Sequence, residues 1–261
     1  MSLKGKSALV TGSTSGIGLG IARALAREGV NIMLTGFGDA AETESLRNGL
    51  AHEFSVQVLF DGSDLSNPDH VASVVAQAQA QFGSLDILVN NAGIQYVSPV
   101  QDFPNDRWEA IIALNLSATF YAMKAAIPLM VSNGWGRIIN IASVHGLVAS
   151  VNKVAYVAAK HGVVGATKVA ALELANDGVT VNAICPGWVL TPLVEEQLER
   201  RADVSGNDVK TEAQMLLAEK QPMDRFTSTD SIGAMVLFLC SDAADTITGS
   251  ALSIDGGWTS Q

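Results

Sequence analysis

Short apolar runs alternate with longer segments of helical periodicity along most of the chain. Runs rich in β-branched residues predict strands at 7–12, 31–36, 56–62, 85–93, 136–143, 179–187 and 250–255. Helical patterns separate them, at about 16–29, 39–54, 67–83, 103–134, 154–178 and 231–242. Strands that are apolar throughout and followed by helices are typical of a parallel sheet covered on both faces. The pattern therefore predicts an α/β fold: a single doubly wound, Rossmann-type domain over residues 1–261.

Two segments depart from this repeat. The predicted helix at about 154–176 is apolar on nearly every side, so we expect one face to cover the sheet and the other to meet another subunit. Residues 190–225 form a long polar insertion before the last predicted helix. Connections of that length are commonly functional, and we expect a helical lid over the carboxyl ends of the strands.

Composition and charge narrow the choice of partners. Hydrophobic residues make up 48% of the 261 residues, charged residues only 16%, and the net charge is −10. An acidic chain without a cluster of Lys and Arg is a poor partner for nucleic acid or an anionic membrane surface. No stretch approaches the ~18 uninterrupted apolar residues of a spanning helix, and no apolar leader precedes the first strand. We expect a cytoplasmic protein, with Cys185 and Cys240 as buried small hydrophobes.

A glycine-rich turn follows the first predicted strand. The sequence "TGSTSGIG" at 11–18 places Gly12, Gly16 and Gly18 between that strand and an amphipathic helix. Glycine allows a tight turn and a close approach of the backbone to a pyrophosphate, and the helix N-terminus offers free N–H groups to the anion. In this position the turn predicts a dinucleotide site, and a purely structural turn is the weaker alternative.

Ser143, Tyr156 and Lys160 form a candidate catalytic group. Ser143 ends a predicted strand, and Tyr156 and Lys160 lie one helical turn apart on one face. A tyrosine with a pKa of about 10 is a poor base at neutral pH unless its phenolate is stabilised. The positive charges of Lys160 and an oxidised nicotinamide ring could lower the pKa of Tyr156 by ~3 units, equivalent to ~4 kcal/mol. The three residues predict alcohol oxidation by hydride transfer.

Several motifs in register resemble the short-chain dehydrogenase/reductase family over the whole chain. They are the Gly-x-x-x-Gly-x-Gly turn, "NNAG" at 90–93, Asn115, Ser143, "YVAAK" at 156–160 and "PG" at 186–187. The resemblance implies that Asn115, Ser143, Tyr156 and Lys160 are catalytic, with Asn115 holding a water that relays protons through Lys160. It also implies a homotetramer.

The predicted cofactor site combines the glycine turn with residues from these motifs. The resemblance implies adenine contacts from Asp64 and Leu65, a ribose floor from 91–93, and Thr191 near the nicotinamide carboxamide. The complete predicted set is Gly12, Thr14, Ser15, Gly16, Ile17, Gly18, Phe37, Asp64, Leu65, Asn91, Ala92, Gly93, Tyr156, Lys160, Pro186, Gly187, Trp188, Val189 and Thr191.

The charge after the second predicted strand bears on the choice between NAD and NADP. A 2′-phosphate requires Arg or Lys there or within the glycine turn, and neither segment contains one. Asp39 would repel a phosphate. The acid that usually binds the ribose is also absent, because Gly36 and Phe37 occupy the end of the strand. The sequence favours NAD, with Phe37 lining the adenine pocket.

Four further polar residues could converge on the catalytic group. Gln95 follows the fourth predicted strand, His145 and Lys153 flank the Ser143–Tyr156 segment, and Gln197 lies in the insertion. Taken alone, each is more simply a surface or loop residue. Together they would suit a small carboxylate, with Lys153 supplying the charge, while Trp188 and Trp258 could enclose a short acyl chain.

Longer motifs resemble the branch of the family whose bacterial members oxidise D-3-hydroxybutyrate. They are "NNAGIQ", "ASVHGLVASVNKVAYVAAKHG", "AICPGWVLTPLVEEQ" and "SIDGGW". The resemblance implies that Gln95, His145, Lys153 and Gln197 bind the substrate carboxylate beside Ser143 and Tyr156.

The leading hypothesis is reversible, NAD-dependent conversion of D-3-hydroxybutyrate to acetoacetate, without a metal ion. A 3-oxoacyl thioester reductase would prefer NADP and require a basic patch for its carrier. Neither a base for the NADP phosphate nor a basic patch is visible in the sequence. A non-catalytic NAD-sensing regulator need not keep Asn115, Ser143, Tyr156 and Lys160 together.

Overall fold

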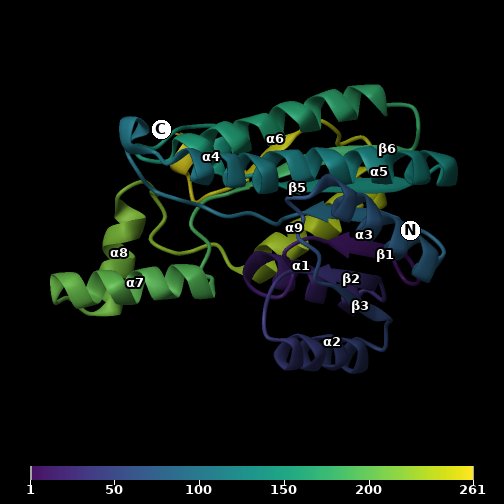
Figure 1. The fold of residues 1–261 in the computed structure, drawn as a ribbon, viewed down its shortest axis with the longest axis horizontal. Helices are drawn as coiled ribbons and strands as arrows, with labels where there is room; N and C mark the ends of the chain where they lie inside the picture. The colour runs from purple at the N-terminus through teal and green to yellow at the C-terminus, as the bar shows by residue number, and fades with distance from the viewer. Residues whose placement is uncertain (1, 261) are drawn as a thin grey trace.

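The computed structural model describes residues 2–260, and its central element is a sheet of seven parallel strands (Figure 1). Their spatial order is β3-β2-β1-β4-β5-β6-β7, which reverses direction between β1 and β4. The strands are β1 (Ser7–Val10), β2 (Asn31–Thr35), β3 (Val58–Asp61), β4 (Ile87–Asn90), β5 (Gly136–Ile141), β6 (Val179–Pro186) and β7 (Ala251–Ile254). The α/β doubly wound architecture predicted from the sequence is confirmed.

Every predicted strand is present, and each is somewhat shorter than its apolar run. In the centre of the sheet Leu9 of β1 pairs with Met33 of β2 and Leu88 of β4, and all three side chains are buried. At the carboxyl ends, Thr11–Gly12 and Asn91–Gly93 lie beyond the observed strands and form turns. These turns build the site described below.

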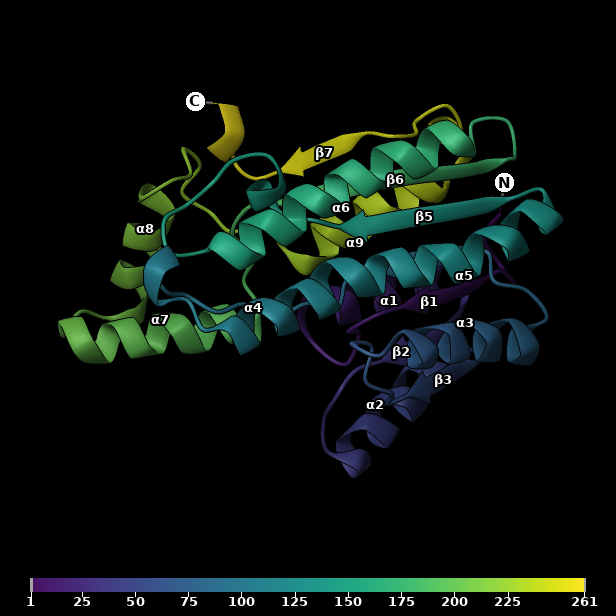
Figure 2. The same ribbon diagram turned by 45° about the horizontal axis from the view of Figure 1, so that its top comes forward.

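Helices cover both faces of the sheet (Figure 2). One face is covered by α1 (Gly16–Arg27), α2 (Ala40–Phe54) and α9 (Thr229–Cys240), which share one buried cluster with the strands. The other face is covered by α3 (Pro68–Phe82), α5 (Ala118–Asn133) and α6 (Val154–Glu173), which contribute to a second cluster. Short 3₁₀ turns complete the fold at η1 (Val100–Asp102), η3 (Val144–Gly146), η4 (Asp242–Ala244) and η5 (Trp258–Ser260).

A long helical segment runs from Asn105 to Asn133. It consists of α4 (Asn105–Ile112), the π-helical turn η2 (Ala113–Ser117) and α5. By length and composition it could cross a membrane, and it is the only such helix among residues 2–260. In the fold α5 lies along the sheet, where Ala122, Ala126 and Met130 are buried in the core, so its apolar character is that of a core helix.

The predicted lid at 190–225 is a helical hairpin that projects from one end of the molecule, at the left of Figure 1. It contains α7 (Pro192–Ser205) and α8 (Val209–Ala218). The base of the hairpin is closed where Val189 pairs with Thr227 as a short parallel bridge.

Buried Glu212 holds the two lid helices together. It accepts hydrogen bonds from Arg201 at 3.0 Å, from Ser205 at 2.6 Å and from Asn207 at 2.9 Å. Arg201 also donates to Glu219 at 2.9 Å.

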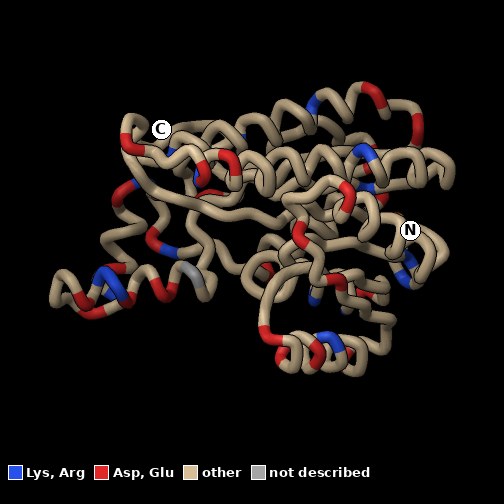
Figure 3. The backbone as a smooth tube through the Cα atoms, in the orientation of Figure 1, with Lys and Arg blue, Asp and Glu red and all other residues tan. Residues whose placement is uncertain are grey.

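Charged residues are scattered over the molecule (Figure 3). Lys and Arg alternate with Asp and Glu, and the lid helices carry both signs. Among residues 2–260 no group of three or more His, Cys, Asp and Glu side chains is placed to hold a metal ion.

Candidate active site

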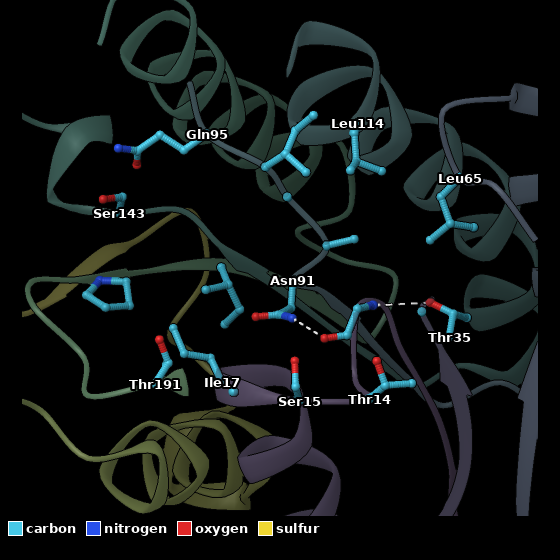
Figure 4. Close-up of a pocket in the computed structure, with 18 of the residues that line it drawn as sticks. Thr14, Ser15, Ile17, Thr35, Leu65, Asn91, Gln95, Leu114, Ser143 and Thr191 are labelled. Atoms are coloured by element: carbon cyan, nitrogen blue, oxygen red, sulfur yellow. Dashed lines mark hydrogen bonds between the residues drawn. The ribbon is translucent and has the colours of Figure 1, made fainter. Parts of the chain in front are cut away.

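A cavity of about 460 Å³ opens at the carboxyl ends of the central strands (Figure 4). It lies where the strand order reverses between β1 and β4, which is the usual ligand position in open α/β sheets. Its lining comprises Gly12, Thr14, Ser15, Gly16, Ile17, Thr35, Gly36, Phe37, Ser63, Leu65, Asn91, Ala92, Gly93, Ile94, Gln95, Leu114, Ile141, Ala142, Ser143, Tyr156, Lys160, Pro186, Gly187, Thr191 and Pro192.

Two glycines of the turn after β1, Gly12 and Gly18, are packed too tightly for a side chain. Gly12 has a φ of +61°, and a Cβ on it would stand 2.9 Å from the Cα of Ala92. A Cβ on Gly18 would meet the Gly12 carbonyl and stand 2.5 Å from Nδ2 of Asn91. The Ser15 side chain does not cap α1, which leaves backbone N–H groups at the start of the helix for a ligand. This cradle fits the pyrophosphate of a dinucleotide.

Hydrogen bonds tie the strand ends together beneath the cavity. The Asn91 side chain donates to the carbonyls of Thr11 and Gly12, both at 2.9 Å, and the Gly12 N–H donates to Oγ1 of Thr35 at 3.1 Å (Figure 4). The Thr11 hydroxyl accepts from the N–H groups of Asn91 and Ala92 at 2.9 and 3.0 Å. The ends of β1, β2 and β4 therefore form one rigid floor.

Most of the predicted cofactor residues line this cavity, and four of them do not: Gly18, Asp64, Trp188 and Val189. Gly18 packs beneath the turn, and Val189 is buried at the base of the lid. The Asp64 carboxylate accepts a hydrogen bond from the N–H of Ser66 at 2.9 Å, which lowers the pKa of Asp64.

Sequence reasoning missed eight lining residues: Thr35, Gly36, Ser63, Ile94, Leu114, Ile141, Ala142 and Pro192. Each lies within two residues of a residue that the sequence analysis had assigned to the site. Proximity to the motifs was therefore the available signal, although it does not reveal which side chains face inward.

Phe37 follows β2 and lines the part of the cavity near β2 and β3, away from Tyr156. Its side chain is 69% exposed, and its carbonyl accepts a hydrogen bond from Oγ1 of Thr14 at 3.2 Å. The strand end offers Gly36 and Phe37 in place of an acid for the ribose hydroxyls, the nearby Asp39 carboxylate caps α2, and no Arg or Lys for a 2′-phosphate lies within 35–39.

Tyr156 and Lys160 on α6 face Ser143 after β5. Nζ of Lys160 donates to the Ile141 carbonyl at 2.7 Å and lies 5.7 Å from the centre of the Tyr156 ring. Burial lowers the pKa of Lys160 to about 8. Burial also raises the pKa of Tyr156, and hydrogen bonding with Ser143 opposes that rise. The direction for Tyr156 is opposite to the lowered pKa expected from sequence, an expectation that included the charge of a bound nicotinamide ring.

Asn115 lies in the π-helical turn η2 and holds the chain just after "NNAG". Its Nδ2 donates to the Ile94 carbonyl and its Oδ1 accepts from the Ile94 N–H, both at 2.9 Å. A π turn inserts one extra residue into a helix and is frequent at functional sites. Here it places a buried amide against the wall of the cavity.

An aromatic wall of His145, Trp188 and Trp258 stands beside the catalytic group. The centre of the Trp258 ring lies 5.5 Å from that of His145 and 5.9 Å from that of Trp188, and His145 lies 5.9 Å from Tyr156. Nζ of Lys153 lies 5.4 Å from the centre of the Trp188 ring. Three of the six predicted substrate residues outside the catalytic group thus form one wall, with Lys153 next to it.

Burial shifts the pKa values of the two basic residues predicted for the substrate site, Lys153 and His145, in the same direction. Burial lowers the pKa of Lys153, while the charge of Glu219 on the lid side opposes that effect. Burial and the Lys153 charge lower the pKa of His145 to about 4, so His145 is neutral at pH 7. Lys153 is therefore the cation available for a carboxylate.

The two predicted glutamines lie in different parts of the fold. Gln95 lines the cavity near Ser143 (Figure 4). Gln197 is half-buried on α7, and within residues 2–260 it makes no hydrogen bond with Gln95, His145 or Lys153.

A family model described as "Enoyl-(Acyl carrier protein) reductase" matches residues 12–259. The doubly wound sheet, the glycine turn and the Ser-Tyr-Lys group agree with that match, and the chain belongs to the short-chain dehydrogenase/reductase family.

Among its relatives, the D-beta-hydroxybutyrate dehydrogenase of Cupriavidus necator is 54% identical over 99% of this chain and 100% of its own. The protein of the same name from Rhizobium meliloti is 50% identical over 98% of this chain and 99% of its own. Among solved structures, L-sorbose reductase from Gluconobacter frateurii complexed with NADPH and L-sorbose superposes with a TM-score of 0.95, at 32% identity and full coverage of both chains. A single-site variant of actinorhodin polyketide ketoreductase with NADPH gives 0.90 at 34% identity, over 98% of both chains.

Proposed function

We propose that the chain is an NAD-dependent dehydrogenase that interconverts D-3-hydroxybutyrate and acetoacetate. The observation that carries the proposal is Lys153, a half-buried cation between the aromatic wall and the lid, close to the catalytic group. A small carboxylate is the ligand that such a cation and enclosed wall would select. Two nearly full-length relatives bear the name of this activity.

Lys153 binds and orients the substrate in this proposal. Its ammonium pairs with the carboxylate, and Gln95 and Gln197 supply hydrogen bonds from opposite sides of the cleft. The aromatic wall encloses the short carbon chain and keeps water away from it. This arrangement presents the C3 hydroxyl to Tyr156.

Tyr156 accepts the proton of the C3 hydroxyl while Ser143 donates a hydrogen bond to the same oxygen. When bound, the nicotinamide accepts the hydride that leaves C3. Lys160 lies close to the tyrosine ring, so its charge favours the phenolate form. Asn115 fixes the backbone at Ile94, and we assign it the water that passes the proton on through Lys160.

NAD is the proposed cofactor because nothing around Phe37 or in the glycine turn would bind a 2′-phosphate. The two structural relatives described above were solved with NADPH, so the assignment rests on the residues of this chain. Asp39, which caps α2, adds negative charge to that end of the cavity.

We further propose a cytoplasmic homotetramer. The outer face of α6 exposes Val169 and Leu172, with Phe120 exposed on neighbouring α5. Apolar faces of this kind are typical of subunit contacts.

The test is NADH or NADPH formation by the purified protein with D-3-hydroxybutyrate. We expect turnover with NAD, weak or no turnover with NADP, and loss of about 100-fold or more in kcat for Tyr156→Phe without loss of NAD binding. Reduction of a 3-oxoacyl thioester by NADPH in preference to acetoacetate by NADH would instead identify a thioester reductase. Cofactor binding without turnover of either substrate would identify a regulator.

A further inference from the structure

The chain returns from the lid to the body of the fold through residues 221–227, which we call the return segment. The N–H of Met223 in this segment donates to the Gly256 carbonyl at 3.0 Å. Gly256 precedes Trp258 of the aromatic wall by two residues, and this C-terminal turn lies beside the returning chain in Figure 2. One end of the return segment is therefore bonded to the turn that carries Trp258.

The other end of the return segment is bonded to Trp188. The N–H of Thr227 donates to the Trp188 carbonyl at 2.9 Å, and Oγ1 of Thr227 donates to the Ile254 carbonyl at 3.2 Å. The rings of Trp188 and Trp258 lie 5.9 Å apart in the wall. The return segment thus joins the backbones that carry both tryptophans.

Gln221 fixes the shape of the return segment. Its side chain is only 4% exposed, and its Nε2 donates to the carbonyls of Met223 at 3.0 Å and Arg225 at 2.6 Å. Carbonyl oxygens only accept hydrogen bonds, so the amide nitrogen is the atom that must face them. Both donors of the amide are used to close the turn from 221 to 225.

Gln221 is also packed directly against the C-terminal turn. A Cβ on Gly256, which has a φ of +59°, would stand 2.5 Å from Nε2 of Gln221. A Cβ on Gly257 would stand 3.3 Å from Cγ of Pro222. In packing this close, a movement of the Gln221 side chain displaces the turn and, with it, Trp258.

We propose that Gln221 is a positioning residue that holds Trp258 in the aromatic wall and thereby limits the length of the substrate's carbon chain. The proposal rests on the proposed function, in which this wall encloses a short acyl chain. The Trp258 ring is 7% exposed and lies 5.5 Å from His145. A ring fixed in this position excludes an additional methylene, whereas a mobile ring would yield to it.

The position of Trp258 can be measured without substrate, by fluorine NMR of the protein labelled with fluorotryptophan at its four tryptophans. The Trp258 signal is identified by its loss in Trp258→Phe. Methionine is similar to glutamine in length but has no donor, so we expect the Trp258 signal to shift and broaden in Gln221→Met. The signals of Trp108 and Trp135 should stay in place. An unchanged Trp258 signal would overturn the proposal.

The kinetic test compares D-3-hydroxybutyrate with D-3-hydroxyvalerate, which is longer by one methylene, at saturating NAD. One methylene in an enclosed pocket changes kcat/KM about 10-fold or more, so the native protein should prefer the shorter acid. We expect this preference to fall about 5-fold in Gln221→Met. Gln221→Asn keeps the amide but shortens its reach by one carbon, so it should give a smaller fall, and it provides the test if Gln221→Met does not fold. Asp224→Asn is the matched control, because Asp224 is exposed in the same segment.

The same comparison separates positioning from a merely structural role. Loss of stability alone would lower kcat/KM for both acids by the same factor and keep the native preference, which would contradict the proposal. A native protein that oxidises neither acid would overturn the proposed function and the limit on chain length with it. The fluorine signals would still decide whether Gln221 holds Trp258.

Discussion

At the scale of single residues, the proposed chemistry depends on Lys153, which lies beside the aromatic wall, and on Tyr156, which lines the cavity. Their spacing from Ser143 predicted a shared cleft, and the structure places them around the aromatic wall and the cavity. The lowered pKa of Tyr156 was predicted for two positive charges, Lys160 and a bound nicotinamide ring, whereas burial raises that pKa in the protein alone. Spacing indicates that Lys160 is near, but it does not indicate the burial that raises the pKa of Tyr156. The contact of His145 with Ser150 was also beyond prediction, because it depends on the path of a loop.

Removing the Lys153 charge should affect substrate binding selectively. We expect Lys153→Met to raise the KM for D-3-hydroxybutyrate about 50-fold, since a hydrogen-bonded ion pair is lost, with a much smaller change in kcat and in the KM for NAD. Lys210→Met on α8 is the control, because that lysine is exposed. The measurement is steady-state kinetics at saturating NAD. An unchanged KM in Lys153→Met would show that Lys153 does not bind the substrate carboxylate.

The same residue predicts the pH dependence of KM. The carboxylate pairs with protonated Lys153, so binding is complete below the pKa of Lys153 and is lost as the pH rises through it. Because burial lowers that pKa from the ordinary 10.5, the loss should begin at a lower pH than for an exposed lysine. KM should rise with alkaline pH in the native protein and stay flat in Lys153→Met. A parallel rise in both proteins would assign the titration to another group.

At the scale of elements, the strands and most helices were predictable because their apolar patterns are long and regular. The exact strand ends were not, since the predicted strands included residues that form the turns of the site, such as Thr11–Gly12 and Asn91–Gly93. The π turn at Asn115 was likewise hidden, because η2 continues the helical pattern of its neighbours. The insertion at 190–225 was predicted to be a helical lid from its length and polarity, and it is helical in the structure. The hydrogen bonds that Glu212 accepts from Arg201 and Ser205 form a brace between the lid helices. This brace could not be predicted, because it exists only when α7 and α8 pack together.

Weakening that brace should loosen the lid without touching the catalytic group. We expect Glu212→Gln to raise the KM for substrate about 5-fold and to speed hydrogen exchange over 192–218, because the ion pair with Arg201 is lost. Glu196→Gln is the matched control, since Glu196 pairs with Arg200 on the exposed side of α7 at 3.6 Å. Equal exchange rates in the two variants would show that Glu212 does not hold the hairpin.

The pKa of Glu212 also determines the pH below which this residue stops stabilising the lid hairpin. Hydrogen bonds from Ser205, Asn207 and Arg201 lower that pKa to about 2. Because the pKa is lowered in the folded state, the stabilising effect is complete above the ordinary value of 4.5 and is lost as the pH falls toward 2. The brace is therefore fully ionised throughout the neutral range in which the assays are made.

At the scale of the whole molecule, the alternating pattern predicted the succession of strands and helices along the chain. The right-handed crossover rule then predicted a doubly wound sheet. The oligomeric state is the property that one chain reveals least, because exposed apolar surface is its only indication. Val169 and Leu172 are 57% and 80% exposed on α6, whose opposite face is buried in the fold through residues such as Val163 and Ala170. This agrees with the pattern of a helix apolar on both sides.

The assembly can be tested at that surface. We expect the native protein to be a tetramer in light scattering, and Leu172→Lys to dissociate it into smaller species by placing a charge in an apolar contact. Val204→Lys on the lid is the control, because Val204 is 90% exposed and lies far along the chain from α6. A native protein that is monomeric would exclude the proposed interface.

The most direct test of the account compares D-3-hydroxybutyrate with its methyl ester as substrates for the native protein with NAD. The ester lacks the charge that Lys153 is proposed to bind and carries one additional methyl group, while the C3 hydroxyl offered to Tyr156 is the same. We predict that kcat/KM for the acid exceeds that for the ester by about 50-fold or more, the magnitude of a charge-assisted contact. Equal or better turnover of the ester would contradict a site built for a small carboxylate.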